Sequence, residues 1–221
     1  MPEPPAERPV FGTVLLAAGS STRMGRAKAL LPWGGSTVLG HAVATWRAAG
    51  VSQLAIVIAA GAADISAELD RLDVPASARI ENPAPGGGMW SSVQTAADWT
   101  GWNPALTHWM LALLDQPLVR TTTLRALMDA ACGEPNLVWQ PEFSGRRCHP
   151  VVLPRREFLA LRRTKAATLR EFLEDRVERR AVMPTDDAGV SMDMDTPADY
   201  ERLARAASFS NRPAGSAGDR A

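Results

Sequence analysis

The sequence predicts an α/β protein with a mostly parallel sheet that is covered by helices on both faces. Short apolar segments alternate along the chain with segments whose apolar residues recur at helical spacing. The apolar segments lack the alternating polar residues of a half-exposed strand, so they are expected to be strands buried on both faces. Ligands bind beyond the carboxyl ends of such strands. The residues that follow each apolar segment are therefore the candidates for chemistry.

Each expected element can be placed from its own residues. Strands are expected at 12–18, 53–60, 78–81, 108–114, 136–140, 148–153 and 177–183. Helices are expected at 37–49, 63–72, 91–99, 121–132, 155–161, 167–174 and 197–207. Gly50 is placed to end the first helix, and the threonines at 121–123 are suited to cap the fourth. Pro197 suits the first turn of the last helix.

A length of 221 residues suits one domain with a full-sized core, which is expected to span residues 11–207. Residues 1–10 are rich in proline and polar side chains, and are expected to form a flexible arm. Residues 208–221 have the composition of a disordered tail.

Charge and cysteine content exclude several classes of function. Lys plus Arg and Asp plus Glu each number 24, so no net basic charge favours nucleic acid or an anionic membrane as partner. The two cysteines, Cys132 and Cys148, form neither a disulfide framework nor a zinc-binding spacing. The first residues lack the pattern of a secretory signal, and no apolar run is long enough to span a bilayer. The protein is expected to be cytoplasmic.

The first apolar segment leads into a loop suited to bind phosphates. Residues 15–28 read LLAAGSSTRMGRAK, with glycines at 19 and 25. Small residues let backbone N–H groups approach an anion, and Arg23 and Lys28 would add positive charge beside a triphosphate. The loop is neither a P-loop nor a G-x-G-x-x-G motif. The alternative is a surface turn with incidental basic residues.

Asp115 ends another apolar segment, in LALLDQP. A carboxylate at the rim of the sheet is a candidate ligand for Mg²⁺, which takes one or two carboxylates together with phosphate oxygens. The alternative is an aspartate that only caps a helix or stabilises a turn.

Two further aspartates, Asp193 and Asp195, alternate near the end of the chain and would share one face in an extended segment. Thr196 and Asp199 are expected to cap the last helix. Capping does not require two preceding aspartates, so Asp195 is the candidate second metal ligand beside Asp115. The residue pattern leaves open whether Asp193 takes that place instead.

A glycine-rich turn at 85–88 precedes the third helix. Gly87 and its neighbours would let a flat nucleotide base lie against the backbone, and Ser91 and Ser92 lie near the start of the helix. The alternative is a flexible loop with an ordinary helix cap.

Four fragments appear in an order that resembles the MobA-like nucleotidyltransferases, in particular the molybdenum cofactor cytidylyltransferases. They are LAAGSSTRMGRAKALLP, DQP, GRRCHPVVL and DMDTPADY, and the resemblance covers about residues 12–205. It implies a Rossmann-like fold of the nucleotide-diphospho-sugar transferase type. It also implies transfer of a nucleoside monophosphate from an NTP to a phosphorylated acceptor, molybdopterin in that branch, with release of pyrophosphate.

The resemblance also implies roles for individual residues. The nucleotide would be bound by Ala17, Ala18, Gly19, Arg23, Lys28, Gly87, Ser91 and Ser92. Mg²⁺ would be held by Asp115 together with Asp195. His149 is the candidate contact for the acceptor phosphate, and the alternative is a packing residue at the start of a strand. The sequence Ala-Ala-Gly in the first loop favours CTP over GTP. A molybdoenzyme is a further expected partner.

Two departures from the family pattern fall in the half expected to bind the acceptor. Cys148 stands where the family has glycine before His-Pro, and residues 164–173 lack the acidic and glycine residues common there. These departures leave a sugar or alditol phosphate as an alternative acceptor. They also leave open a non-catalytic chaperone for molybdoenzyme cofactors, or a reductase that uses the same fold.

Overall fold

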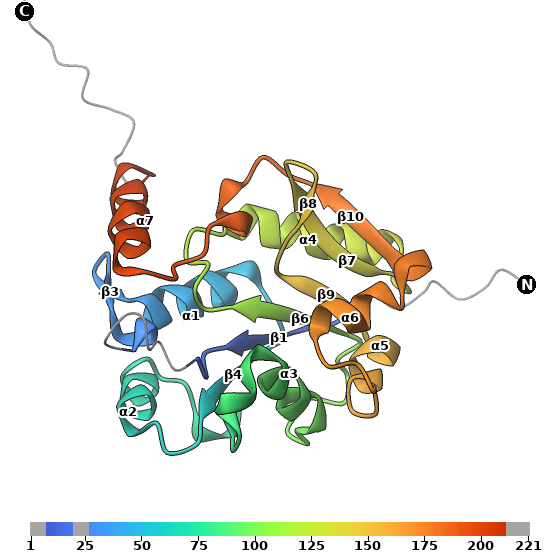
Figure 1. Ribbon diagram of the computed structural model, residues 1–221, viewed down its shortest axis with the longest axis horizontal. Helices are drawn as coiled ribbons and strands as arrows, with labels where there is room; N and C mark the ends of the chain where they lie inside the picture. Colours follow the sequence, from blue (N-terminus) through green and yellow to red (C-terminus); the bar gives the residue numbers. More distant parts are fainter. Residues whose placement is uncertain (1–7, 20–26, 211–221) are drawn as a thin grey trace, which may run out of the picture.

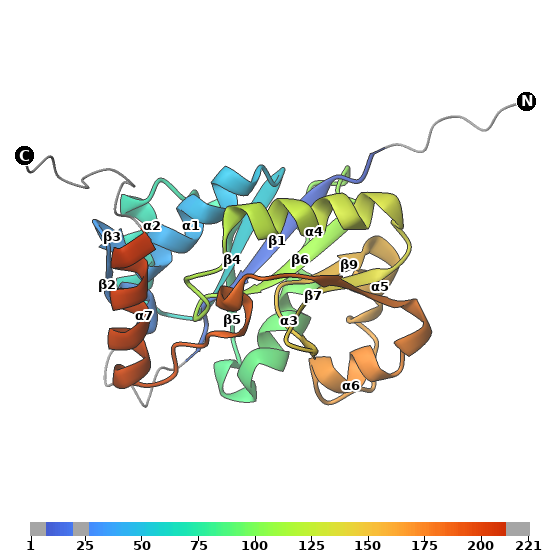
Figure 2. The ribbon, with the colours of Figure 1, turned by 90° about the horizontal axis from the view of Figure 1, so that it is seen from above.

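The computed structural model describes residues 8–19 and 27–210, and within these ranges eight strands form one sheet with helices on both faces (Figures 1 and 2). The strands are β1 (Phe11–Leu16), β2 (Pro32–Trp33), β3 (Ser36–Thr37), β4 (Gln53–Ala59), β5 (Arg79–Asn82), β6 (His108–Leu113), β7 (Val138–Phe143), β8 (Arg146–Arg147), β9 (Val151–Pro154) and β10 (Arg180–Pro184). The helices are α1 (Val38–Ala49), α2 (Ala63–Arg71), α3 (Gly88–Asp98), α4 (Thr121–Gly133), α5 (Arg155–Ala160), α6 (Leu169–Glu174) and α7 (Pro197–Ser210).

The sheet has the strand order β10-β7-β9-β6-β1-β4-β5, with β8 paired to β7 and a separate hairpin of β2 and β3. β1 is parallel to β4 and β6, β4 to β5, and β10 to β7. β9 lies antiparallel between β6 and β7. The prediction of a mostly parallel sheet is therefore confirmed. Because β1 is central and runs parallel to β6, residues that follow these two strands emerge at the same edge.

Successive residues of β1 face opposite layers of helices. Leu15 packs in the apolar cluster beneath α1, α2 and α4, whereas Val14 packs in the cluster with α3, α5 and α6. Both side chains are fully buried. A strand covered on both faces cannot alternate polar and apolar residues, which explains the continuous apolar run in the sequence.

Several boundaries differ from those expected. α3 begins at Gly88 rather than residue 91, because the glycines form a 3₁₀ turn that leads directly into the helix. The strand expected at 177–183 begins at Arg180, after a 3₁₀ turn at 177–179. α7 extends to Ser210.

The expectation that a threonine caps α4 is wrong. The N-cap residue is Arg120, whose side chain makes no capping bond, and the threonines lie inside the first turn. The carboxylate of Asp187 stands at this helix start and accepts a hydrogen bond from the Arg120 N–H. A group distant in sequence thus replaces the local cap.

The expected arm and tail lie largely outside the described residues, which omit 1–7, 20–26 and 211–221. In the part of the chain that the structure describes, no helix has the length and apolar character needed to cross a membrane.

Substitutions of two leucines test how much the core contributes to the free energy of unfolding. Leu15 is fully buried in the central strand, and Leu159 in α5 is 44% exposed. Leu15→Ala is expected to lower the free energy of unfolding by about 2–5 kcal/mol, since it removes buried apolar contacts and leaves a cavity. Leu159→Ala should cost less than about 1 kcal/mol. Urea unfolding followed by circular dichroism measures both, and equal losses would contradict this description of the core.

Candidate functional site

A cavity of about 510 Å³ lies where β1 and β6 end, at the carboxyl edge of the sheet. Its walls come from the residues after these two strands, from the glycine turn before α3 and from the segment before α7. The lining residues that matter for chemistry are Ala17, Ala18, Gly19, Lys28, Gly86, Gly88, Ser92, Asp115 and Asp195. Segments far apart in the sequence therefore converge on one hollow.

The wall beyond β1 consists of small residues. Ala17 and Ala18 are both buried, and the Ala17 N–H donates to the Val57 carbonyl at 2.8 Å, which prolongs the pairing of β1 with β4. A Cβ atom added at Gly19 would meet nothing within 4 Å, so this residue borders open space. Backbone with such small side chains leaves room for a ligand to approach closely.

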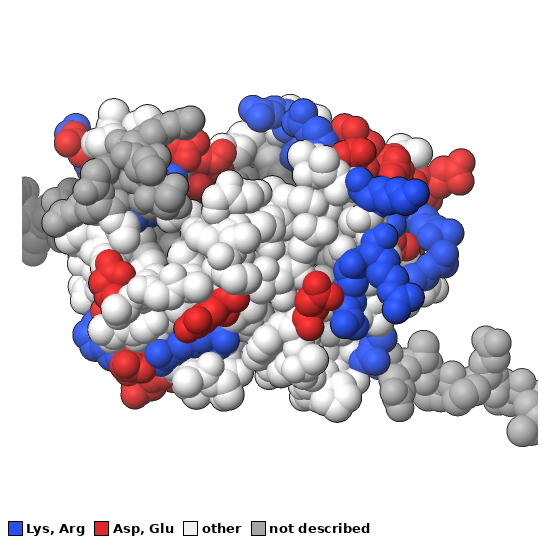
Figure 3. Space-filling view, turned by 60° about the horizontal axis from the view of Figure 1, so that its bottom comes forward, with Lys and Arg blue, Asp and Glu red and all other residues white. Residues whose placement is uncertain are grey.

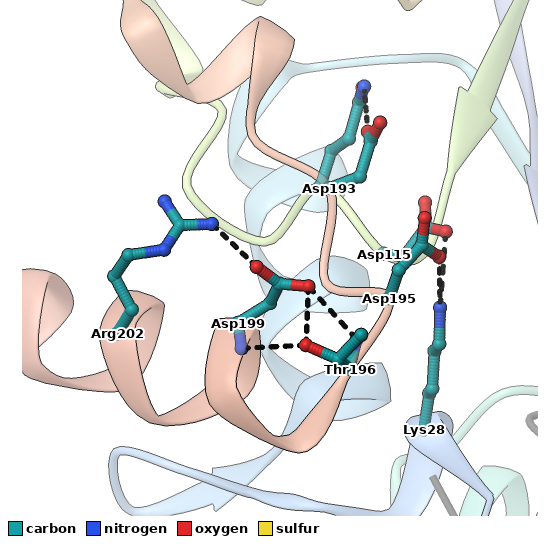
Figure 4. A network of polar contacts seen from close by, with 8 residues as sticks. Lys28, Asp115, Asp193, Asp195, Thr196, Asp199 and Arg202 are labelled. Atoms are coloured by element: carbon teal, nitrogen blue, oxygen red, sulfur yellow. Dashed lines mark hydrogen bonds and ion pairs between the residues drawn. The ribbon is translucent and has the colours of Figure 1, made fainter. Parts of the chain in front are cut away.

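Two carboxylates meet one ammonium group in the cavity. Lys28 lies in the 3₁₀ turn at 28–30, and its Nζ is 2.8 Å from Asp195 Oδ1 and 3.6 Å from Asp115 Oδ2 (Figure 4). The Lys28 side chain is only 16% exposed, so water screens these ion pairs incompletely. The structure thus brings together Lys28, Asp115 and Asp195, three of the charged residues that the sequence singled out.

Asp195 is held in place through the loop after Asp115. The Met194 N–H donates to the Asp115 carbonyl at 2.9 Å. Gln116 Nε2 donates to the Asp193 Oδ1 atom at 2.9 Å, so Asp193 is turned toward Gln116 while Asp195 faces Lys28 (Figure 4). Sequence reasoning missed Gln116, although its position directly after Asp115 was a usable signal.

The segment then enters α7 through a local cap. The Thr196 hydroxyl accepts from the Asp199 N–H at 3.2 Å, and Asp199 Oδ2 accepts from the Thr196 N–H at 3.0 Å. The expected capping pair is confirmed. Hydrogen bonds from Arg202 and then from Thr196 lower the pKa of Asp199 to about 2, so this carboxylate stays ionised at neutral pH.

The pKa of Asp115 is raised above its ordinary value of 3.8. The largest cause is burial, which disfavours the charged form. Lys28 lowers the pKa, and the negative charges of Asp193 and Asp195 raise it. The carboxylate cluster thus carries an electrostatic cost that one lysine does not fully offset.

The glycine turn and the serines of α3 are organised by Asn82, at the carboxyl end of β5. Asn82 is fully buried, and its Nδ2 donates to Ser91 Oγ at 2.9 Å and to Ser92 Oγ at 3.0 Å. A Cβ at Gly87 would lie 2.9 Å from Ser91 Cβ, so this turn requires glycine. Ser92 lines the cavity, whereas Ser91 and Gly87 are not among the lining residues. Asn82 was missed, although a polar residue ends its strand.

The structure does not place two other predicted residues in this cavity: His149 does not line it, and Arg23 lies outside the described residues. The Nδ1 atom of His149 lies 3.4 Å from the Leu111 carbonyl, and burial lowers the pKa of the ring.

The chain is similar in sequence and in fold to known proteins. Residues 13–182 match the model of the MobA-like NTP transferase domain. The chain belongs to this family. Its fold and its cavity at the carboxyl edge agree with that membership.

Two curated relatives carry different names. The nicotine blue oxidoreductase of Paenarthrobacter nicotinovorans is 30% identical over 209 residues, covering 88% of this chain and 97% of that protein. The bifunctional protein GlmU of Burkholderia vietnamiensis is 34% identical over 120 residues, covering 53% of this chain. The match spans a quarter of that longer protein (25%), so it concerns only part of GlmU.

One similar solved structure contains a metal ion. Rv0371c of Mycobacterium tuberculosis H37Rv, solved in complex with manganese, is 28% identical with a TM-score of 0.66. The alignment covers 90% of this chain and 99% of that one.

The raised pKa of Asp115 predicts a pH-dependent effect on stability. The folded protein binds this proton more tightly than the unfolded chain, so stability is lost as pH rises from 3.8 through the raised folded value. Asp115→Asn removes this cost. In EDTA, the variant should gain little over the wild type near about pH 3 and should become increasingly more stable toward about pH 7.

Urea unfolding at several pH values measures this difference. Asp186→Asn, at a carboxylate whose side chain is 94% exposed, is the control. An Asp115→Asn protein that is less stable than the wild type at neutral pH would contradict the electrostatic description.

Proposed function

We propose that this protein transfers a nucleoside monophosphate, CMP in preference, from an NTP to a phosphorylated small-molecule acceptor, with Mg²⁺ as cofactor. Molybdopterin is the first acceptor to consider, which would place the reaction in molybdenum cofactor biosynthesis in the cytoplasm and make a molybdoenzyme a partner. The observation that carries the proposal is the meeting of Lys28, Asp115 and Asp195 beside the small-residue wall at 17–19.

The carboxylate pair fits a divalent cation. Asp115 and Asp195 both reach the same positive atom, Lys28 Nζ, so their oxygens already converge on one cationic position. Among the described residues, no three His, Cys, Asp or Glu side chains gather as a metal site. Two carboxylates with phosphate oxygens are the usual surroundings of Mg²⁺ in phosphoryl-transfer sites. Asp115 and Asp195 would therefore hold the ion, which supplies charge neutralisation for phosphate when bound.

The reaction requires positioning and charge more than covalent chemistry. An oxygen of the acceptor phosphate attacks the α-phosphorus of the NTP. The bond from that phosphorus to the bridging oxygen of the β-phosphate breaks, and pyrophosphate leaves. Lys28 stabilises the negative charge on the phosphates, with Arg23 as a second cation. A phosphate nucleophile is already ionised at neutral pH and needs no general base.

The nucleotide half of the proposal rests on the wall residues and the glycine turn. Ala17, Ala18 and Gly19 leave room for the nucleotide, and Ser92 adds a hydroxyl to the same cavity. Gly86 and Gly88 would let the base lie against the backbone. The preference for CTP rests on the Ala-Ala-Gly order in the first loop.

The half of the chain expected to bind the acceptor is rich in basic residues. Residues 146–180 contain eleven of the 24 Lys and Arg residues but five of the 24 Asp and Glu residues. Basic side chains gather at the end of the molecule where Figure 1 places α5 and α6 (Figure 3). His149, which belongs to this half, is the proposed contact for the acceptor phosphate.

Nucleotide binding is the first test of the proposal. The full-length protein is heated with Mg²⁺ and CTP, GTP, ATP or UTP in turn, and the shift in unfolding temperature is recorded. A shift with CTP is expected, because a ligand that binds only the folded state stabilises it. A shift with another nucleotide alone would overturn the CTP preference, and no shift with any NTP would overturn nucleotidyl transfer.

Substitutions in the carboxylate cluster test the roles of its residues. Asp115→Ala and Lys28→Met should each lower the rate of pyrophosphate release by about 10²–10³-fold, since each removes charge that is aligned with the phosphates. Asp98→Asn, at a carboxylate whose side chain is 62% exposed, should leave the rate unchanged. Circular dichroism verifies the folding of each variant. Rates near that of the wild type in Asp115→Ala would rule out the metal assignment.

The serine arrangement gives an independent prediction for nucleotide affinity. Asn82→Asp keeps the shape of the side chain but replaces the donor that holds both serine hydroxyls with an acceptor. The dissociation constant of the bound NTP should rise about tenfold, equivalent to about 1.4 kcal/mol. Glu81→Gln, at an exposed neighbour, is the control. Calorimetric titration measures the affinity of each variant, and an Asn82→Asp affinity equal to that of the wild type would show that the hydrogen bonds from Asn82 do not contribute to nucleotide binding.

A second candidate function is redox chemistry, favoured by the match with an oxidoreductase over 88% of this chain. The same thermal-shift plate should include NADH and NADPH. Stabilisation by a nicotinamide nucleotide, without stabilisation by any NTP, would favour this candidate. The cationic and acidic groups in the cavity favour nucleotidyl transfer, because hydride transfer does not require a pair of carboxylates beside a lysine.

A further inference from the structure

Asp187 is a buried carboxylate that the proposed reaction does not use. It is 1% exposed and lies between β10 and the segment that carries Asp195. Oδ2 accepts from the Arg120 N–H at 2.9 Å and from the Thr123 hydroxyl at 2.7 Å, and Oδ1 accepts from the Gly189 N–H at 3.0 Å. One carboxylate thus satisfies donors from two separate parts of the chain.

These bonds tie the start of α4 to the segment 188–195. Gly189 lies so close to the loop before α4 that an added Cβ would be 2.3 Å from the Leu118 carbonyl oxygen. Gln116 Nε2 donates to the Val190 carbonyl at 3.1 Å, and the Met194 N–H donates to the Asp115 carbonyl. The segment therefore follows the 115–120 loop along its length, and Asp187 fixes the far end.

We infer that Asp187 is a positioning residue, whose carboxylate clamps the segment 188–195 so that Asp195 reaches the Lys28 ammonium beside Asp115. The inference rests on the proposed function only for the role of Asp195 in holding a cation. The clamp itself follows from the hydrogen bonds. It acts through the backbone, because Asp187 does not line the cavity.

A full carboxylate is needed for this clamp. Both oxygens accept hydrogen bonds, Oδ2 from the start of α4 and Oδ1 from Gly189, and an amide would replace one acceptor with a donor. The negative charge also lies at the amino end of α4, where the helix dipole favours it. Asp186 offers a matched comparison: its side chain is 94% exposed, and among the described residues it bonds to Arg120 Nη1, at 3.3 Å.

The experiment compares Asp187→Asn with Asp186→Asn in the full-length protein. Hydrogen–deuterium exchange is followed in peptides that cover residues 188–195, and binding of Mn²⁺ without nucleotide is measured by electron paramagnetic resonance. In Asp187→Asn the amides of this segment should exchange roughly tenfold faster, because the clamp opens locally. The Mn²⁺ dissociation constant should rise about 10-fold or more, as for other residues that orient metal ligands. Asp186→Asn should change neither quantity.

A second pair of variants covers the case in which Asp187→Asn fails to fold. Thr123→Val removes one donor to the carboxylate at nearly constant volume, and Thr123→Ser restores a hydroxyl. Faster exchange of residues 188–195 in the valine variant, reversed in the serine variant, supports the clamp.

The two readouts separate the clamp from the proposed function. Unchanged exchange in both Asp187→Asn and Thr123→Val would overturn the positioning role. Faster exchange in a protein whose wild type binds no Mn²⁺ would leave the clamp standing and overturn the metal site. Faster exchange with unchanged Mn²⁺ affinity would overturn the link between Asp187 and Asp195.

Discussion

The contact on which the site depends is that of Lys28 with Asp115 and Asp195. Asp115 is largely buried and is repelled by the neighbouring carboxylate of Asp195, so a cation between the two favours their proximity. Lys28 provides it at 2.8 and 3.6 Å. Burial raises the pKa of Asp115, and the negative charges of Asp193 and Asp195 raise it further, so Lys28 offsets the negative charge of the cluster only in part. The negative charge that Lys28 does not offset lowers the free energy of unfolding, and the same charge favours binding of a cation.

The fold brings these three residues together by a simple rule of topology and one long-range addition. β1 and β6 are parallel neighbours, so the loops after them, which carry Lys28 and Asp115, emerge at the same edge. Asp195 lies in the segment after β10, at the edge of the sheet. Because β10 pairs with neither β1 nor β6, strand pairing does not explain why Asp195 lies beside Lys28 and Asp115. Its approach depends on the hydrogen bonds that bind residues 187–194 to the loop after β6. The first two residues are placed by the sheet, and the third by side-chain and backbone bonds.

This division explains how far sequence reasoning could reach. Buried strands, most helices and the candidates at strand ends follow from local patterns, because apolar runs and the residues after them are adjacent in sequence. The choice between Asp193 and Asp195 was open because alternation places both on one face. Contacts made in the folded chain separate them, since Asp193 bonds to Gln116 and Asp195 to Lys28. Asn82 and Asp187 were missed for the same reason: each acts on donors or acceptors in segments that the chain reaches only after folding. Burial of a polar residue cannot be read from a local pattern.

The residues that depart from the family pattern have structural contacts in this chain. In residues 164–173, Thr168 and Glu171 form a reciprocal cap, with the Glu171 N–H donating to Thr168 Oγ1 and Glu171 Oε2 accepting from the Ala167 N–H. Leu169 and Phe172 bury their side chains in the core. Cys148 is likewise buried, and its Sγ donates to the Arg146 carbonyl. These side chains serve packing and capping in this chain. Lys28, Asp115 and Asp195 meet in the cavity expected to bind the nucleotide. Nucleotide binding is therefore the property to establish before any acceptor.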